Sequence, residues 1–277
     1  MSIITITTDA YNNGRSLAES VAQAMGYPCI GDEMATLASE TYEVTESKLV
    51  QALKTSPPFF DRLFSRRQRY IAYLEAVISD KMLCQDIVYH GVVGLPVIRQ
   101  VSHAFKVRVV ANIEDRIRIF IKKEHLSGKV EARDRIFKED EDRKRWARRI
   151  YGIDISDSSI YDLVVNIGHM GAEDTEDAVE TIVGTAKHKK FKPMTYSLNC
   201  MKNIALSCKI KAAFCQIDPK MEVKSDRGTV YVFTGAFRRK KQDQLIDLKQ
   251  QIMKLDGVEH AEVYVKKEIF DSKSRGH

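Results

Sequence analysis

A turn near the start of the chain carries residue types that bind phosphate. Asp9, Gly14, Arg15 and Ser16 follow the spacing G-x-x-x-x-G-K-[ST] of a phosphate-binding loop, with aspartate at the first glycine and arginine at the lysine. Arginine can contact phosphate through two N–H groups at once, and a serine hydroxyl at this place can hold Mg²⁺. The match is partial, so an ordinary connection between a strand and a helix is the alternative interpretation.

The segments on either side of this turn are those that a phosphate-binding loop needs. Residues 3–8 are a β-branched run, which predicts a buried strand, and the helix after the turn is expected to stop at Gly26. Within the turn, Asn12 and Asn13 are the non-glycine residues that most readily adopt a positive φ. Backbone N–H groups and a helix N-terminus in this setting can hold a phosphate group.

A second candidate region is the segment 131–149, in which fourteen of nineteen residues are charged. Most such runs are solvated helices with ion pairs along them. The functional alternative is a lid, in which Arg133, Arg143 and Arg148 close over nucleotide phosphates and neutralise charge in the transition state. Both interpretations are open from the residues alone.

Composition limits the class of protein. The chain has 277 residues, 44% of them hydrophobic and 30% charged, and no apolar run reaches the roughly 18 residues that a membrane span needs. No signal peptide is expected at the N-terminus, so the cytoplasm is the expected compartment. Five cysteines without a C-x-x-C pair indicate neither a zinc site nor a disulfide framework. Cys200, Cys208 and Cys215 share one face of a predicted helix, which favours a buried apolar stripe over a metal or redox site.

The chain is expected to form two domains, residues 1–188 and 189–277, joined by a basic stretch at 187–193. Residues 190–277 contain 18 Lys and Arg against 10 Asp and Glu, whereas the rest of the chain carries a net charge of −2. This asymmetry favours an anionic partner for the second domain, or else a solvated basic surface. The oligomeric state is open.

The patterns of both parts predict their fold classes. In the first part strands alternate with helices, which predicts a parallel α/β sheet with helices on both faces. The expected strands are 86–93, 106–111 and 162–167, and the expected helices are 115–123 and 173–186. The second part predicts a small α+β unit of the order αββαβ, with elements at 199–214, 221–224, 229–234, 242–255 and 258–265.

Residues 1–186 resemble the cytidylate kinase-like family, relatives of the nucleoside monophosphate kinases that have a P-loop. The residues that carry the resemblance are Tyr11, Gly14 and Arg15 in the turn, followed by Lys138, Asp140, Arg143, Trp146, Gly152, Asp154, Tyr161, Asp162, Leu163, Asn166 and Gly171. The resemblance implies a P-loop kinase fold with a lid, and transfer of a phosphoryl group from ATP to CMP or dCMP.

The resemblance also implies a role for each candidate residue. Catalysis would rest on Arg15, Arg133, Asp140 and Arg143, and ATP would be bound by Asn12, Asn13, Gly14, Arg15 and Ser16. Ser16 would hold Mg²⁺, and Asp32 and Arg148 would bind the acceptor nucleotide. Arg66, Arg67 and Arg69 can supply charge for the acceptor phosphate or lie on the surface.

Two departures from the family pattern support an alternative function. Tyr11 and Asn13 stand where the family has glycines, and Val92 stands where it has an arginine that contacts the nucleotide. The alternative is a degenerate kinase that binds a nucleotide, transfers nothing, and acts as a regulator.

The C-terminal part resembles the BON domain, a small bacterial module. The residues that carry this resemblance are Gly228, Val230, Val232, Gly235, Gly257, Val258 and Val263. It implies binding of phospholipid or another ligand without catalysis, and the basic cluster 238–241 can contact an anionic surface or merely begin a helix. A third hypothesis is therefore a scaffold in which this domain binds the anionic ligand.

Overall fold

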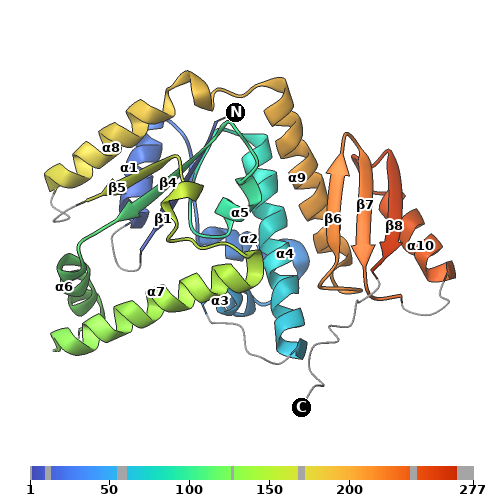
Figure 1. Ribbon diagram of the computed structural model, residues 1–277, viewed down its shortest axis with the longest axis horizontal. Helices are drawn as coiled ribbons and strands as arrows, with labels where there is room; N and C mark the ends of the chain where they lie inside the picture. The colour runs from blue at the N-terminus through green and yellow to red at the C-terminus, as the bar shows by residue number, and fades with distance from the viewer. Residues whose placement is uncertain are drawn as a thin grey trace, which may run out of the picture.

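The computed structural model describes residues 2–9, 14–54, 61–125, 128–167, 172–237 and 242–266. Its larger unit is built on a five-stranded parallel sheet (Figure 1). The strands, in spatial order, are β2 (Cys29–Ile30), β3 (Ile87–His90), β1 (Ile3–Thr8), β4 (Ala104–Val110) and β5 (Leu163–Asn166). The expected α/β class with a parallel sheet is confirmed.

The central strand β1 is buried because β-branched side chains leave it on both faces. Ile3 packs into one hydrophobic core, whereas Ile4 and Ile6 pack into another on the opposite face. This alternation is the period-2 geometry of a strand covered by helices on both sides.

Helices of the larger unit cover both faces of the sheet (Figure 1). On the side of Ile4 lie α1 (Gly14–Met25) and α8 (Ala172–Ala186). The opposite core is built by α2 (Glu33–Tyr42), α3 (Glu46–Lys54), α4 (Asp61–Cys84) and α5 (Gly94–Ile98). Two further helices, α6 (Ile113–Glu124) and α7 (Lys129–Tyr151), pack on each other through a small apolar cluster of their own.

The smaller unit follows the predicted order of elements. It comprises α9 (Thr195–Phe214), β6 (Glu222–Asp226), β7 (Thr229–Thr234), α10 (Gln242–Met253) and β8 (His260–Val265). Strand β7 pairs antiparallel with β6 and parallel with β8. The expected hairpin is present, with Arg227 and Gly228 both at positive φ in its two-residue turn.

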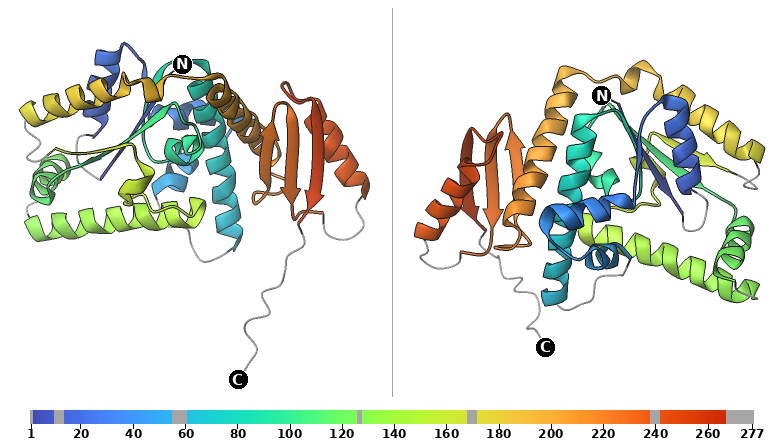
Figure 2. Two further views of the ribbon diagram at one scale, coloured as in Figure 1. Left: turned by 45° about the horizontal axis from the view of Figure 1, so that its top comes forward. Right: turned by 180° about the vertical axis from the view of Figure 1, so that it is seen from behind.

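Helix α9 packs on both units, and Figure 2 shows it between α4 and the three-stranded sheet. Its cysteine face, with Cys200, Cys208 and Cys215, belongs to the core that includes α4. Ile210 and Phe214 instead join the core of the smaller unit. The expected apolar stripe is therefore observed, and the division at residue 188 stays a prediction.

A buried ion pair crosses the contact between α4 and α9. Lys211 Nζ lies 3.0 Å from Glu75 Oε2, and the Glu75 side chain is only 8% exposed. The Glu75 carboxylate raises the pKa of Lys211 above its ordinary value, so the lysine is charged at neutral pH.

The sequence predictions and the structure differ in several places, of which two concern the crevice side and the main core. Strand β3 stops at His90 instead of continuing to residue 93, because Gly91 takes φ +149°. The sequence analysis also made no prediction for the long helix α4, whose apolar residues occur on more than one side. Among the described residues, every helix is too short or too polar to span a lipid bilayer.

Candidate active site at the strand ends

The carboxyl ends of β1, β3 and β4 meet at one edge of the sheet. The chain passes from β1 to one side of the sheet and from β3 to the other, so a crevice is expected beyond the end of β1. Helix α1 begins at Gly14, directly beside this strand end. A Cβ atom on Gly14 would lie 2.2 Å from Cγ2 of Thr8, so this close approach excludes any larger residue.

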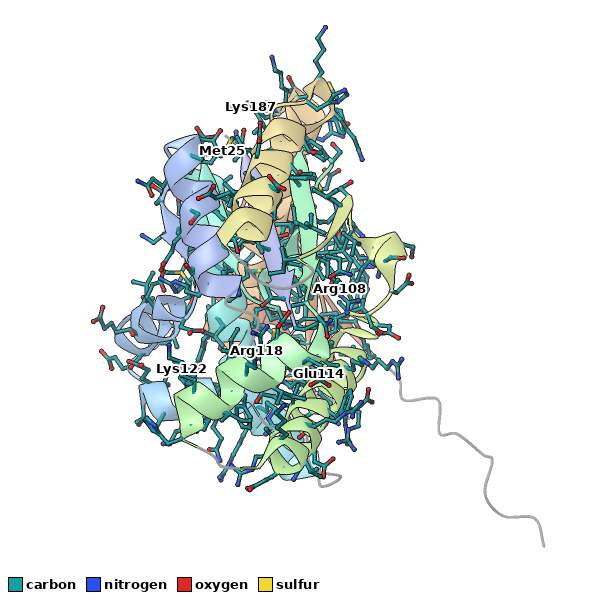
Figure 3. All side chains as sticks on the ribbon, turned by 90° about the vertical axis from the view of Figure 1, so that its left-hand side faces the viewer. Met25, Arg108, Glu114, Arg118, Lys122 and Lys187 are labelled. Atoms are coloured by element: carbon teal, nitrogen blue, oxygen red, sulfur yellow. The ribbon has the colours of Figure 1, made fainter. Side chains whose placement is uncertain are left out.

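Asp9 and Arg108 form an ion pair at the root of the turn. Arg108 Nη2 lies 3.2 Å from Asp9 Oδ1, and its Nη1 donates to the carbonyl oxygen of Ser156 at 2.6 Å. Figure 3 labels Arg108 above Glu114, which lies in the first turn of α6. A carboxylate here would repel a phosphate, and the arginine offsets that charge.

Helix α7 brings Arg143 over the end of β1. Arg143 Nη1 donates to the carbonyl oxygen of Thr8 at 3.5 Å, and Nη2 forms an ion pair with Glu139 at 3.0 Å. Arg143, Lys144 and Asp9 line a cavity of about 20 Å³ at this place. A space of that size holds about one water molecule.

Packing of α7 fixes where these cations lie. The Trp146 indole N–H donates to the carbonyl oxygen of Ala52 at 2.9 Å in a buried position. Nearer the start of the helix, Asp140 forms an ion pair at 2.5 Å with the buried Arg116 of α6. The helix also carries pairs along its own surface, such as Arg135 with Glu131. It therefore has the surface of an ion-paired helix and also contributes Arg143 to the crevice.

Arg15 is held by two carboxylates. Its Nε lies 2.6 Å from Glu19 and its Nη1 lies 2.9 Å from Glu33, and these two hydrogen bonds raise the pKa of Arg15. Burial alone would raise the pKa of Glu33, but hydrogen bonds from backbone N–H groups and from Arg15 outweigh it and hold the pKa below its usual range. Of the two neighbouring acids that follow β2, Glu33 is therefore the one that forms an ion pair with Arg15, next to the predicted Asp32.

His90 completes the edge of the crevice. Its Nε2 lies 3.2 Å from the Thr8 hydroxyl. Burial lowers the pKa of His90, and the charges of Arg15 and Arg143 lower it as well, against the opposing effect of the Asp32 carboxylate. The imidazole is therefore neutral at neutral pH and can hold the end of β1 without adding charge.

A comparison with known families decides the identity of this unit. The model described as the cytidylate kinase-like family matches residues 3–169, which is more than half of the chain. The protein belongs to the cytidylate kinase-like family. The matched part of this cytidylate kinase-like chain contains every residue of the crevice and ends before the smaller unit.

Solved structures resemble this cytidylate kinase-like protein in fold. An uncharacterized protein from Eubacterium ventriosum ATCC 27560 superposes with a TM-score of 0.52 at 17% identity, covering 67% of this chain and 97% of that one. A shikimate kinase from Bacteroides thetaiotaomicron matches with a TM-score of 0.44 at 10% identity, over 68% of this chain and 99% of that one. A gluconokinase from Sinorhizobium meliloti 1021 gives 0.39 at 12% identity, over 67% and 94%. No curated protein matches the chain significantly.

The predicted site residues of this family member do not all come together. Arg143 and Asp140 line the small cavity, and Gly14 and Ser16 lie in the first turn of α1, where Ser16 is exposed. Asn12 and Asn13 lie outside the described residues.

Two other predicted arginines also lie on α7 but do not line the small cavity. Arg133 is ten residues before Arg143 on α7, about 15 Å along the helix, and its guanidinium lies 5.6 Å from the ring of Phe137. Arg148 forms an ion pair with Asp154, whose pKa is lowered by hydrogen bonds from Ser156 and by Arg148.

Sequence reasoning missed Arg108, Glu33 and His90 as parts of the site. A signal was present for Arg108, because an arginine inside the apolar run 107–110 has to find a partner when the strand is buried. Nothing in the pattern separated Glu33 from Asp32, since both follow β2 directly.

Proposed function

We propose that this protein is a nucleoside monophosphate kinase-type phosphotransferase that uses ATP and acts on CMP or dCMP. The observation that carries the proposal is the contact of Arg143 with the end of β1, beside the Gly14 N-terminus of α1. This contact places the Arg143 guanidinium of α7, the proposed lid helix, next to the N-terminus of α1, where backbone N–H groups favour a phosphate. Membership of the cytidylate kinase-like family supports the same chemistry.

In the proposed reaction an oxygen of the acceptor phosphate attacks the γ-phosphorus of ATP, and the bond to the leaving ADP oxygen breaks. Arg143 stabilises the charge on the transferring group, and Arg15 contacts the phosphates of ATP after release from Glu33. Asp140 holds α7 against α6 through Arg116, so it acts as a positioning residue. Arg133 and Arg148 are further candidates for contact when the helix closes, and Asp32 lies beside the proposed acceptor site.

The residues present fit Mg²⁺ of the kind that kinases use. The described residues contain no group of three or more His, Cys, Asp or Glu that could hold a metal ion. Mg²⁺ in such sites needs few protein ligands, because phosphates and water supply the rest. The Ser16 hydroxyl, exposed in the first turn of α1, is the ligand we propose. When bound, the ion neutralises phosphate charge.

The test is a coupled assay of ADP release with Mg·ATP and a panel of nucleoside monophosphates, together with a calorimetric titration of ATP. We expect turnover with CMP or dCMP above that with the other acceptors. Turnover with a different acceptor would contradict CMP and dCMP as the substrates. Binding of ATP without turnover would contradict the phosphotransferase activity itself.

A degenerate nucleotide-binding protein is the second candidate. Arg15 is engaged by two carboxylates, Tyr11 and Asn13 replace glycines of the family, and Val92 replaces an arginine; on this alternative each of these weakens phosphate binding. On this alternative, ATP binds without transfer, and the nucleotide state is reported to the smaller unit. Absence of ATP binding in the calorimetric titration would exclude both candidates.

For residues 189–277 we propose a BON-like unit with an anionic ligand. Its predicted αββαβ order supports the proposal. The basic cluster 238–241 lies outside the described residues, so the ligand-binding role of that cluster stays a prediction.

A further inference from the structure

A cleft of about 600 Å³ lies between the two units and is separate from the crevice at the strand ends. Helices α2 and α4 form one wall, and α9 with the turns at Gly228 and Gly257 forms the other. Figure 2 shows α9 running between α4 and the smaller sheet. The volume falls within the range of about 300 to 1,000 Å³ that is typical of pockets for small organic ligands.

The floor of the cleft is apolar. Ala76, Val77 and Ala205 are buried there, and Tyr42 and Leu206 are half-buried. The Tyr42 ring stacks on Tyr73 with centroids 4.3 Å apart, which fixes its orientation. An apolar body of a ligand would cover this surface and remove it from water.

The cleft is also lined by basic side chains. Lys81, Lys202 and Lys209 line the cleft, and no described carboxylate lies within 4 Å of their ammonium groups. Arg227 is the fourth cation, 3.6 Å from Asp226. Two acids, Asp80 and Asp256, also line the cleft, so the lining carries a net positive charge.

The hairpin turn between β6 and β7 presents Arg227 to the cleft and is anchored to α9. Arg227 has φ +46°, and its backbone N–H donates to Asn203 Oδ1 of α9 at 3.0 Å. The next residue, Gly228, has φ +80°, and a Cβ there would lie 2.7 Å from Glu259. Positive φ at both positions is what a two-residue hairpin turn requires, so the turn itself fixes where Arg227 lies.

We propose that this cleft binds a small organic anion with an apolar body, its anionic group meeting Lys202, Lys209 and Arg227 and its body lying on Tyr42, Val77 and Leu206. The site is independent of the phosphotransferase proposal, because no residue of the cleft lines the crevice at the strand ends.

The probe for the test is 8-anilinonaphthalene-1-sulfonate, which joins an aromatic body to one anionic group and fluoresces when bound in an apolar site. We expect saturable binding of one probe per full-length chain. Replacing both exposed lysines, Lys202→Glu with Lys209→Glu, should weaken binding at least tenfold. The matched control is Lys224→Glu with Lys249→Glu, which makes the same charge change at exposed positions of the smaller unit outside the cleft.

A second variant tests the apolar part. Thr41 is exposed and lines the cleft, so Thr41→Trp should fill the space without disturbing the core, and probe binding should fall. Binding that is unchanged in both cleft variants overturns the proposal. Displacement of the probe by Mg·ATP or CMP, or its loss in Arg143→Ala, would place the probe in the strand-end crevice and also overturn it. Displacement of the probe by decanoate or by 1-naphthyl phosphate, but not by nucleotides, would support the proposal. The compound that competes better would distinguish a carboxylate ligand from a phosphate ligand.

Discussion

The crevice at the strand ends and the cleft between the units differ in how their charges are used. In the crevice, of about 20 Å³, Arg108 is paired with Asp9 and Arg143 with Glu139. In the cleft, of about 600 Å³, Lys202 and Lys209 have no carboxylate partner among the described residues. A phosphate entering the crevice must therefore compete with carboxylates, whereas an anion entering the cleft meets cations that are already available.

This difference implies two modes of binding. In the crevice a phosphate has to replace a carboxylate at Arg108 or Arg143, which lowers the apparent affinity. The cleft is preformed, so its ligand should bind without such a change. Helices α4 and α9 form opposite walls of the cleft, and the Glu75–Lys211 ion pair lies in the contact between them.

The largest expected effect comes from removing the guanidinium that α7 brings to the crevice. Arg143→Ala should lower kcat with Mg·ATP and CMP by about 10³-fold, the order found when an arginine that stabilises the transferring phosphoryl group is lost. The control is Arg145→Ala, an exposed arginine of the same helix that is paired with Asp142. Full activity in Arg143→Ala would show that α7 has no role in transfer.

Much of this crevice could be predicted from the sequence, and the limits have physical reasons. The strand at residues 3–8, the glycine at 14 and Arg143 followed from periodicity and motif spacing, which are local properties. The pairing of Arg108 with Asp9 joins residues 99 positions apart, and no local pattern encodes it. The cleft escaped prediction because it forms only when α4 and α9 pack together, far apart in the chain.

Mutation of the buried ion pair tests how firmly α4 and α9, the two walls of the preformed cleft, are joined. Lys211→Met leaves the Glu75 carboxylate buried without its partner and should lower the free energy of unfolding by about 3 kcal/mol. The double variant with Glu75→Leu should recover most of that loss, because an apolar pair of similar volume can replace a buried ion pair. Denaturant unfolding monitored by the single tryptophan measures both, with the exposed Lys209→Met as control.

The pH dependence of this pair has a defined sign. Glu75 raises the pKa of Lys211 in the folded protein, so the contribution of Lys211 to stability is fully present below the ordinary lysine pKa. It is lost as the pH rises through the raised value. The difference in unfolding free energy between the wild type and the double variant should therefore be flat from pH 7 to 9 and change only at strongly alkaline pH.

The smallest expected effect concerns the carboxylate that competes with phosphate for Arg15. Glu33→Gln removes the charge that holds Nη1 of Arg15, so the guanidinium becomes available to ATP. Because the Arg15 and Glu33 side chains are both 41% exposed, the pair is worth less than about 1 kcal/mol, and the Kd for ATP should fall by no more than about fivefold. Calorimetry on Glu33→Gln and on the exposed Glu40→Gln of the same helix separates this effect from a general loss of negative charge. If ATP binds Glu33→Gln more weakly than the wild type, the carboxylate positions Arg15 for phosphate instead of competing with it, and the contrast between paired and available cations would no longer describe the crevice.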